Sequence, residues 1–153
     1  VNLYGPGDNF DPAASHVIPA LIRKVVDVQR QGQAEITVWG SGKASREFLF
    51  VEDATQAVAL ATACYNSATP VNVGSGQEIT IAELAELICE LVSFRGRIYW
   101  DSSKPDGQPR RCLETSRARE GFGFQSRTSL RAGLLKTIHW YRAHAASSTG
   151  KAA

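Results

Sequence analysis

The spacing of apolar residues along the chain predicts four helices. Apolar side chains recur every three or four residues, as on the buried face of a helix, in four segments: 15–32, 51–65, 80–91 and 129–144. Ser15 is a candidate N-cap of the first helix, and Gly32 is a candidate end. The third helix begins with a capping box, because the Thr80 hydroxyl and the Glu83 carboxylate can each accept a hydrogen bond from a backbone N–H at its start.

Shorter segments have the composition of strands. Four of them are predicted: 35–39, 45–51, 70–73 and 97–100. A Gly-rich turn at residues 40–43 separates the first two, so we expect these to form a two-strand unit around it. Strands that alternate with helices are typical of an α/β fold. We expect one domain over residues 1–146, followed by a flexible tail over residues 147–153.

Composition and charge narrow the class of protein. The 153 residues are 43% hydrophobic and 21% charged, as in one globular domain. The net charge is +2 and no long basic run is present, which favours small anionic ligands over nucleic acid. The longest apolar runs fall short of the roughly 20 residues that a membrane helix needs. We therefore expect no membrane contact. The three cysteines occur singly, so we expect buried free thiols and no metal site, as in a cytoplasmic protein.

Several short motifs occur in an order that resembles one enzyme family. The motifs are Asn2-Leu3-Tyr4-Gly5-Pro6, Ser15-His16-Val17-Ile18-Pro19, Val38-Trp39-Gly40-Ser41-Gly42, Arg46-Glu47-Phe48, Asn72-Val73-Gly74 and Ser103-Lys104-Pro105-Asp106-Gly107. From the first residue to about Tyr141, the chain resembles the GDP-L-fucose synthases, which belong to the extended short-chain dehydrogenase/reductases of the NAD-dependent epimerase/dehydratase family. The resemblance implies the C-terminal, substrate-binding portion of that α/β fold, with the N-terminal Rossmann dinucleotide-binding part missing.

The resemblance also implies a reaction. Enzymes of this family epimerise GDP-4-keto-6-deoxy-D-mannose at the two carbons beside its ketone and then reduce the ketone with NADPH, which gives GDP-L-fucose. Epimerisation needs a general acid whose pKa lies near neutrality, and a histidine suits that role. By resemblance, His16 is this catalytic residue, and it also contacts NADP together with Asn2 and Leu3. Without the resemblance, a plain helix-start residue is the simpler interpretation of His16.

The substrate contacts of the family fall on Lys24, Trp39, Arg46 and Asp106. Arg46 follows the Gly-rich turn and can aim a guanidinium at a pyrophosphate with bidentate geometry. By resemblance, Trp39 offers an aromatic face, Lys24 a cation and Asp106 an acceptor for base or sugar groups. Lys24 stands where bacterial synthases are expected to carry arginine. Without the resemblance, Trp39 would be interpreted as a core residue, Lys24 as a helix-surface residue and Asp106 as a turn residue. Arg46 would be a strand-edge arginine paired with Glu47 or Glu52.

Two motifs of the family are missing from this sequence. It contains no Gly-rich dinucleotide loop and no Tyr-x-x-x-Lys helix, so whether the chain is itself an enzyme stays open. The chain starts at Val1 and contains no methionine, and we expect it to be a piece of a longer protein. We therefore expect NADP to be bound mainly by the missing half, and the chain alone to turn over nothing.

Partners and alternatives follow from the same features. We expect a GDP-sugar as ligand, and as protein partner either the missing Rossmann half or a second copy, joined through an exposed sheet edge near Leu3. Two other functions remain open at this stage. One is a fragment of another NAD(P)-dependent nucleotide-sugar epimerase or dehydratase, and the other is a non-catalytic sugar-nucleotide-binding module.

Overall fold

The computed structural model describes residues 1–148, with the side chains of residues 1–145. Its helices are α1 (Val17–Arg30), α2 (Val51–Cys64), α3 (Ile81–Val92), α4 (Ser116–Phe122) and α5 (Leu130–Ser148). Its strands are β1 (Asn2–Tyr4), β2 (Glu35–Trp39), β3 (Ser45–Phe50), β4 (Glu78–Thr80), β5 (Arg97–Asp101) and β6 (Arg110–Arg111). A flexible tail was expected over residues 147–153. Its first two residues belong to α5, which continues through Ser148, and residues 149–153 lie outside the described residues.

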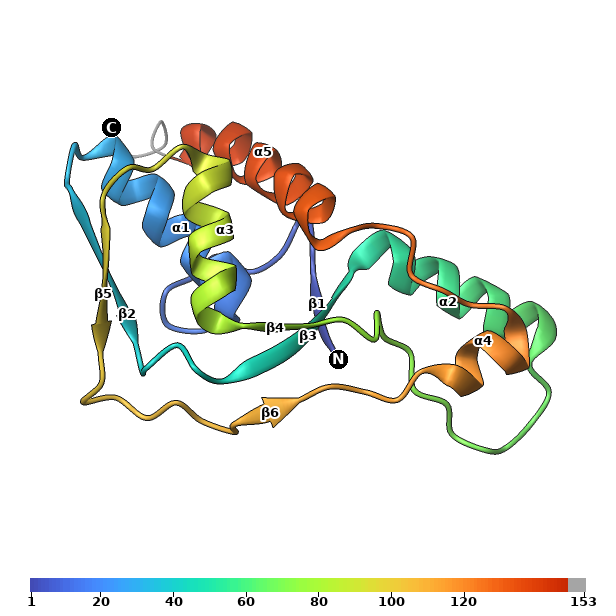
Figure 1. Cartoon of the computed structure of the whole chain (residues 1–153). Coiled ribbons are helices and arrows are strands. Elements are labelled where there is room, and N and C mark those ends of the chain that lie inside the picture. Colours follow the sequence, from blue (N-terminus) through green and yellow to red (C-terminus); the bar gives the residue numbers. More distant parts are fainter. Residues whose placement is uncertain (149–153) are drawn as a thin grey trace.

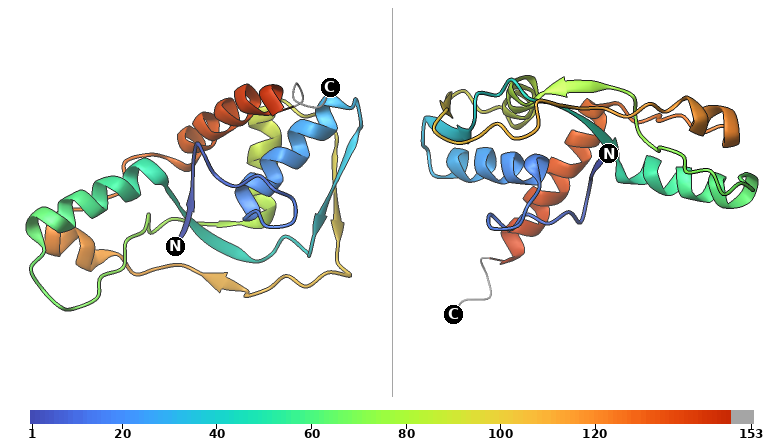
Figure 2. Two further views of the ribbon diagram at one scale, coloured as in Figure 1. Left: turned by 180° about the vertical axis from the view of Figure 1, so that it is seen from behind. Right: turned by 90° about the horizontal axis from the view of Figure 1, so that it is seen from below.

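Strand β3 is the centre of the fold (Figure 1). Its C-terminal half pairs in parallel with β1, and its N-terminal half pairs with β4 in antiparallel and with β6 in parallel orientation. Because side chains alternate along a strand, β3 contributes to two hydrophobic clusters. Phe48 and Phe50 join the larger cluster, around which α1, α3 and α5 pack, and Leu49 joins the smaller one with α2 and α4. The two groups of helices lie at opposite ends of the molecule (Figures 1 and 2).

The helix starts show which local signals decide the structure. The capping box of α3 is confirmed, because Thr80 Oγ1 accepts the Glu83 N–H at 3.2 Å and Glu83 Oε2 accepts the Thr80 N–H at 2.9 Å. The N-cap of α1 is His16, whose backbone is extended and whose side chain makes no capping hydrogen bond. The prediction that Ser15 caps this helix is therefore wrong, by one residue.

Two predictions about strands are also wrong. β2 and β3 do not form a two-strand unit, because β2 pairs in parallel with β5, from Glu35 opposite Arg97 to Trp39 opposite Asp101. Gly40, with a φ of 86°, turns the chain out of the β2–β5 pair and toward β3. The segment 70–73 is not a strand, and its valines are half-buried against the smaller cluster without a pairing partner.

Asp53 joins the start of α2 to the segment before α5. Its carboxylate is 5% exposed and accepts four hydrogen bonds of 2.8 to 3.1 Å from residues 126–128. Burial alone would raise the pKa of Asp53, but the donors of Thr128, Ser126 and Arg127 hold it below its ordinary value. The charged carboxylate therefore fixes where α5 begins.

The remaining sequence expectations concern cysteines and membranes. Cys89 is buried as expected, but Cys64 is exposed, because α2 buries little beyond Asp53 and Ala57. All three cysteines are free. None of the helices among the described residues combines the length and apolarity that crossing a bilayer requires.

Candidate functional site

The Lys24 side chain reaches from α1 to β2, the strand that ends at Trp39. The Lys24 ammonium donates a hydrogen bond to the backbone carbonyl of Thr37 at 2.5 Å, and its partial burial lowers its pKa below the usual value. Trp39, two residues further along the strand, is 69% exposed. The Lys104 ammonium lies 5.7 Å from the centroid of the Trp39 ring. Trp39 therefore presents a ring face to solvent instead of filling the core.

Asp106 holds the loop after β5 against the turn after β2. Its two carboxylate oxygens accept the Ser41 N–H at 2.5 Å and the Ser41 hydroxyl at 2.7 Å. These hydrogen bonds keep the pKa of Asp106 below its ordinary value, so it is charged at neutral pH. Any Cβ atom at Gly40 would collide with this carboxylate, which explains the glycine. Each oxygen keeps further lone-pair positions for a ligand donor.

Arg46 lies beside the same loop. Its Nη1 donates to the carbonyl of Ser45 at 2.7 Å, and a Cβ atom built at Gly107 would lie 3.7 Å from its Nη2. The alternative pairing with a neighbouring glutamate does not occur: the Glu47 carboxylate accepts backbone N–H groups, and Glu52 pairs with Lys136. The guanidinium of Arg46 is therefore left with donors for a ligand.

Arg111 is a candidate site residue that the sequence interpretation missed. In the parallel pairing of β3 with β6, Ser45 lies opposite Arg110 and Arg46 lies opposite Arg111. Residues directly opposite one another in a ladder project to the same face of the sheet, so Arg46 and Arg111 lie side by side. Arg110 is neutralised by Glu78 at 2.8 Å, whereas Arg111 is exposed and has no ion-pair partner among the described residues. The only sequence signal was an arginine pair shortly after the 103–107 motif.

The three residues expected to contact the cofactor lie elsewhere. His16 is exposed at the start of α1, two helical turns before Lys24, which corresponds to a rise of about 12 Å. The Asn2 side chain donates to the carbonyl of Glu47 at 3.2 Å, and Leu3 is 48% exposed on β1. Among the described residues, no hydrogen bond or ion pair joins the His16 side chain to the other expected site residues. Their roles stay predictions.

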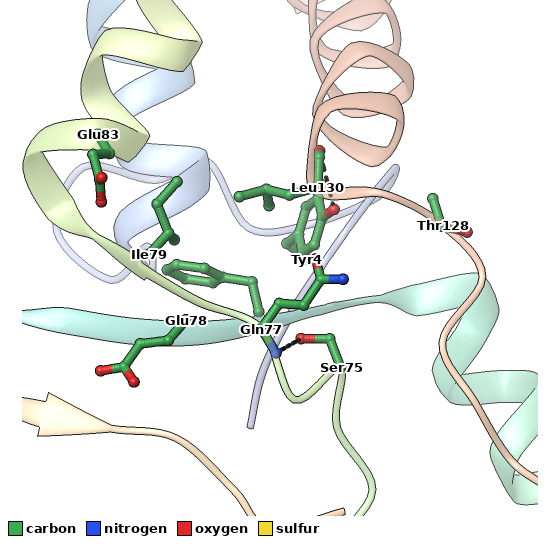
Figure 3. Close-up of a pocket in the computed structure, with 9 residues that line it drawn as sticks. Tyr4, Ser75, Gln77, Glu78, Ile79, Glu83, Thr128 and Leu130 are labelled. Atoms are coloured by element: carbon green, nitrogen blue, oxygen red, sulfur yellow. Dashed lines mark hydrogen bonds between the residues drawn. The ribbon is translucent and has the colours of Figure 1, made fainter.

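A separate pocket of about 280 Å³ lies between β3, β4 and the starts of α3 and α5 (Figure 3). Tyr4 lines it, and the Tyr4 hydroxyl donates to the carbonyl of Leu130 at 3.4 Å. Burial raises the pKa of Tyr4, so this phenol is neutral. Two carboxylates, Glu78 and Glu83, also line the pocket, and hydrogen bonds from Ser45 and Thr80 respectively lower their pKa values. Glu78 is paired with Arg110, but Glu83 has no ion-pair partner among the described residues, and its charge disfavours an anionic ligand in this pocket.

The residues around the end of β2 form what we call the rim: Lys24, Trp39, Arg46, Lys104, Asp106 and Arg111. The rim combines several cations, one exposed aromatic face and one carboxylate. Such a set can bind a diphosphate through the arginines and a flat ring through stacking and a carboxylate hydrogen bond. Among the described residues, no group of three or more His, Cys, Asp or Glu side chains could hold a metal ion.

Comparisons with known proteins agree with the resemblance of the motifs. The NAD dependent epimerase/dehydratase family matches residues 1–74. A probable GDP-L-fucose synthase 1 of Oryza sativa subsp. japonica is 49% identical over 140 residues, which cover 92% of this chain and 42% of the relative. The GDP-L-fucose synthase of Escherichia coli (strain K12) is 43% identical over 149 residues, which cover 92% and 46%.

A solved structure supports the same relationship. The crystal structure of a GDP-L-fucose synthetase from Naegleria fowleri bound to NADP has a TM-score of 0.87 and 31% identity, and the match covers 95% of this chain and 46% of that one. The chain thus spans less than half the length of these relatives. The expected fold, a portion of an extended short-chain dehydrogenase/reductase, is confirmed. Residues 1–74 of the chain thus match the NAD-dependent epimerase/dehydratase family, and the resemblance of the chain to the GDP-L-fucose synthases is confirmed.

Proposed function

We propose that this chain is the GDP-sugar-binding portion of a GDP-L-fucose synthase, with residues 1–146 as its substrate-binding domain. The rim is the observation that carries the proposal. Guanine offers a ring N–H and an adjacent amino group, and the charged carboxylate of Asp106 suits these two neighbouring donors. The Trp39 face stacks on the base, and Arg46, Arg111 and Lys24 bind the two phosphates.

The sugar end of the ligand is proposed to extend toward His16. His16 is exposed and its side chain makes no capping hydrogen bond, so its imidazole can exchange a proton with a carbon beside the ketone. NADPH, when bound, supplies the hydride that reduces the ketone. Asn2 and Leu3 fit a place beside that cofactor, because the partly exposed Leu3 side chain offers an apolar surface that a ring can cover.

The chain alone is expected to consume no NADPH. The Gly-rich loop and the Tyr-x-x-x-Lys motif that serve dinucleotide binding and ketone protonation are not in this sequence. Absorbance at the NADPH band, followed with GDP-4-keto-6-deoxy-D-mannose and the purified chain, should stay constant. Steady oxidation would contradict the assignment of the chain as a substrate-binding portion. A chain that binds GDP without turnover, even when supplied with a dinucleotide-binding half, would instead support a non-catalytic binding module.

The surface around β1 is proposed as the contact for that half, or for a second copy when the half is absent. Among the described residues, β1 pairs only with β3, so one strand edge keeps unpaired backbone groups. Helix α2 contacts β1, and each element leaves an apolar side chain exposed: Val58 on the helix is 66% exposed and Leu3 on the strand is 48% exposed. An open edge next to apolar side chains favours association.

Light scattering of the purified chain is therefore expected to give a mass above that of a monomer at micromolar concentration. Replacing Val58 with glutamate should shift the chain toward monomer, because it places a charge on this surface. Tyr99→Glu is the matched control, since Tyr99 is 56% exposed on β5, outside this surface. A monomeric wild-type chain, or equal effects of the two variants, would contradict the proposed contact.

A further inference from the structure

Glu47 is a buried carboxylate that the roles above do not use. Its side chain is 1% exposed, although glutamate is rarely buried so deeply unless it is paired. No ion pair to Glu47 exists among the residues that the structure describes. Its charge is instead satisfied by hydrogen-bond donors that come from two distant segments of the chain.

The donors lie on both sides of the carboxylate. Glu47 Oε1 accepts the Gly76 N–H at 2.8 Å and lies 3.5 Å from the Ser75 hydroxyl. Glu47 Oε2 accepts the Leu113 N–H at 2.6 Å. A Cβ atom at Gly74 would collide with Oε1, so the Asn-Val-Gly motif is shaped to admit this carboxylate. Glu47 thus joins β3, the loop after Val73 and the end of β6.

This arrangement fixes the short strand β6 at both ends. Before the strand, the Ser45 N–H donates to the carbonyl of Pro109 at 2.9 Å. After it, the Leu113 N–H donates to Glu47. Ser45 and Glu47 flank Arg46, so the two ties hold Arg111 opposite Arg46. A two-residue strand has too few ladder hydrogen bonds of its own to define this register firmly.

We propose that Glu47 is a positioning residue that sets the spacing of Arg46 and Arg111 and so determines that the site takes a diphosphate in preference to a monophosphate. The inference rests on the proposed function, because it assumes that these arginines bind the ligand phosphates. Two guanidinium groups held side by side can contact two successive phosphates, whereas one group suffices for a single phosphate. Without the hydrogen bond from the Leu113 N–H to Glu47, Arg111 is no longer held opposite Arg46, while Arg46 itself keeps its position in β3.

The test compares GDP with GMP by calorimetric titration of the full chain. For Glu47→Gln, the Kd for GDP should rise about tenfold while the Kd for GMP changes less than about twofold, because the second phosphate loses its guanidinium. In an Arg111→Gln background, the same change should have little further effect on GDP binding, since both act through one group. Glu47→Asp, which keeps the charge, should fall between wild type and Glu47→Gln.

Asp53→Asn is the matched control. Asp53 is also a buried carboxylate that accepts backbone N–H groups, but it holds residues 126–128 instead of β6. This variant should lower the melting temperature and leave the GDP-to-GMP ratio unchanged. If Glu47→Gln does not fold, the same comparison is made with Glu47→Asp, checked by circular dichroism.

Three results would overturn the inference. A Glu47 variant that folds and keeps the wild-type GDP-to-GMP ratio removes the positioning role, while the proposed function stands. The positioning role is also removed if Glu47→Gln weakens GDP binding by the same factor in the wild-type and in the Arg111→Gln background. A wild-type chain that binds GDP no more tightly than GMP disproves the diphosphate site itself, and the proposed function fails together with the inference.

Discussion

Replacing Arg46 with glutamine is expected to weaken GDP binding by about 2–3 kcal/mol, which corresponds to a Kd about 30 to 150 times higher. Arg46 lies beside the loop that carries Asp106, and no carboxylate among the described residues pairs with it. Losing it removes charge-assisted hydrogen bonds to phosphate that no neighbouring residue replaces. Calorimetric titration with GDP measures the change directly.

The controls separate charge from geometry. Arg46→Lys keeps the charge but loses the planar fork, so it should recover only part of the affinity. Arg95→Gln removes one exposed arginine at the opposite end of β5 and should leave the Kd unchanged. Equal losses for Arg46→Gln and Arg95→Gln would show that only the net charge matters, and would remove Arg46 from the site.

Asp53→Asn is expected to lower the free energy of unfolding at neutral pH by about 2–4 kcal/mol. The variant replaces a buried carboxylate that accepts four hydrogen bonds with an amide whose nitrogen faces donors. The start of α5 then loses its fixed position against α2. Urea denaturation followed by circular dichroism gives the difference between the two proteins.

The effect of Asp53 should depend on pH in one direction. Its pKa is lower in the folded chain than the ordinary value of 3.8, so its contribution is fully present above that value and is lost as pH falls through the folded pKa. The stability difference between wild type and Asp53→Asn should therefore shrink in acid. A difference that stays constant from neutral pH down to about pH 2 would show that the carboxylate charge is not what stabilises this junction.

Local signals predicted four of the five helices that the structure describes, and the short helix α4 was missed. The capping box at Thr80 and the apolar spacing of α1, α2, α3 and α5 depend on residues close in sequence, and each helix appears within a few residues of its expected bounds. Strand pairing was harder to predict, because β2 pairs with β5, which lies about 60 residues further along the chain, beyond helices α2 and α3. The glycines after Trp39 resembled a hairpin turn, although they lead the chain from one sheet to another.

In the candidate site too, the residues within local motifs were predicted, and those placed by long-range pairing were not. The motifs gave Lys24, Trp39, Arg46 and Asp106, which the structure places along one rim. Arg111 could not be found this way, because only its register against β3 places it beside Arg46. The role of Glu47 could not be predicted either, because its carboxylate accepts the N–H groups of Gly76 and Leu113, which are far away in the sequence.

The most direct test of the account is a calorimetric titration of the purified chain with GDP and, separately, with UDP. Uracil offers one ring N–H where guanine offers two adjacent donors, so Asp106 should favour guanine. We expect saturable binding of GDP and a Kd for UDP at least about tenfold higher. Equal affinities for the two nucleotides, or no binding of GDP, would contradict the assignment of this chain as a GDP-sugar-binding portion.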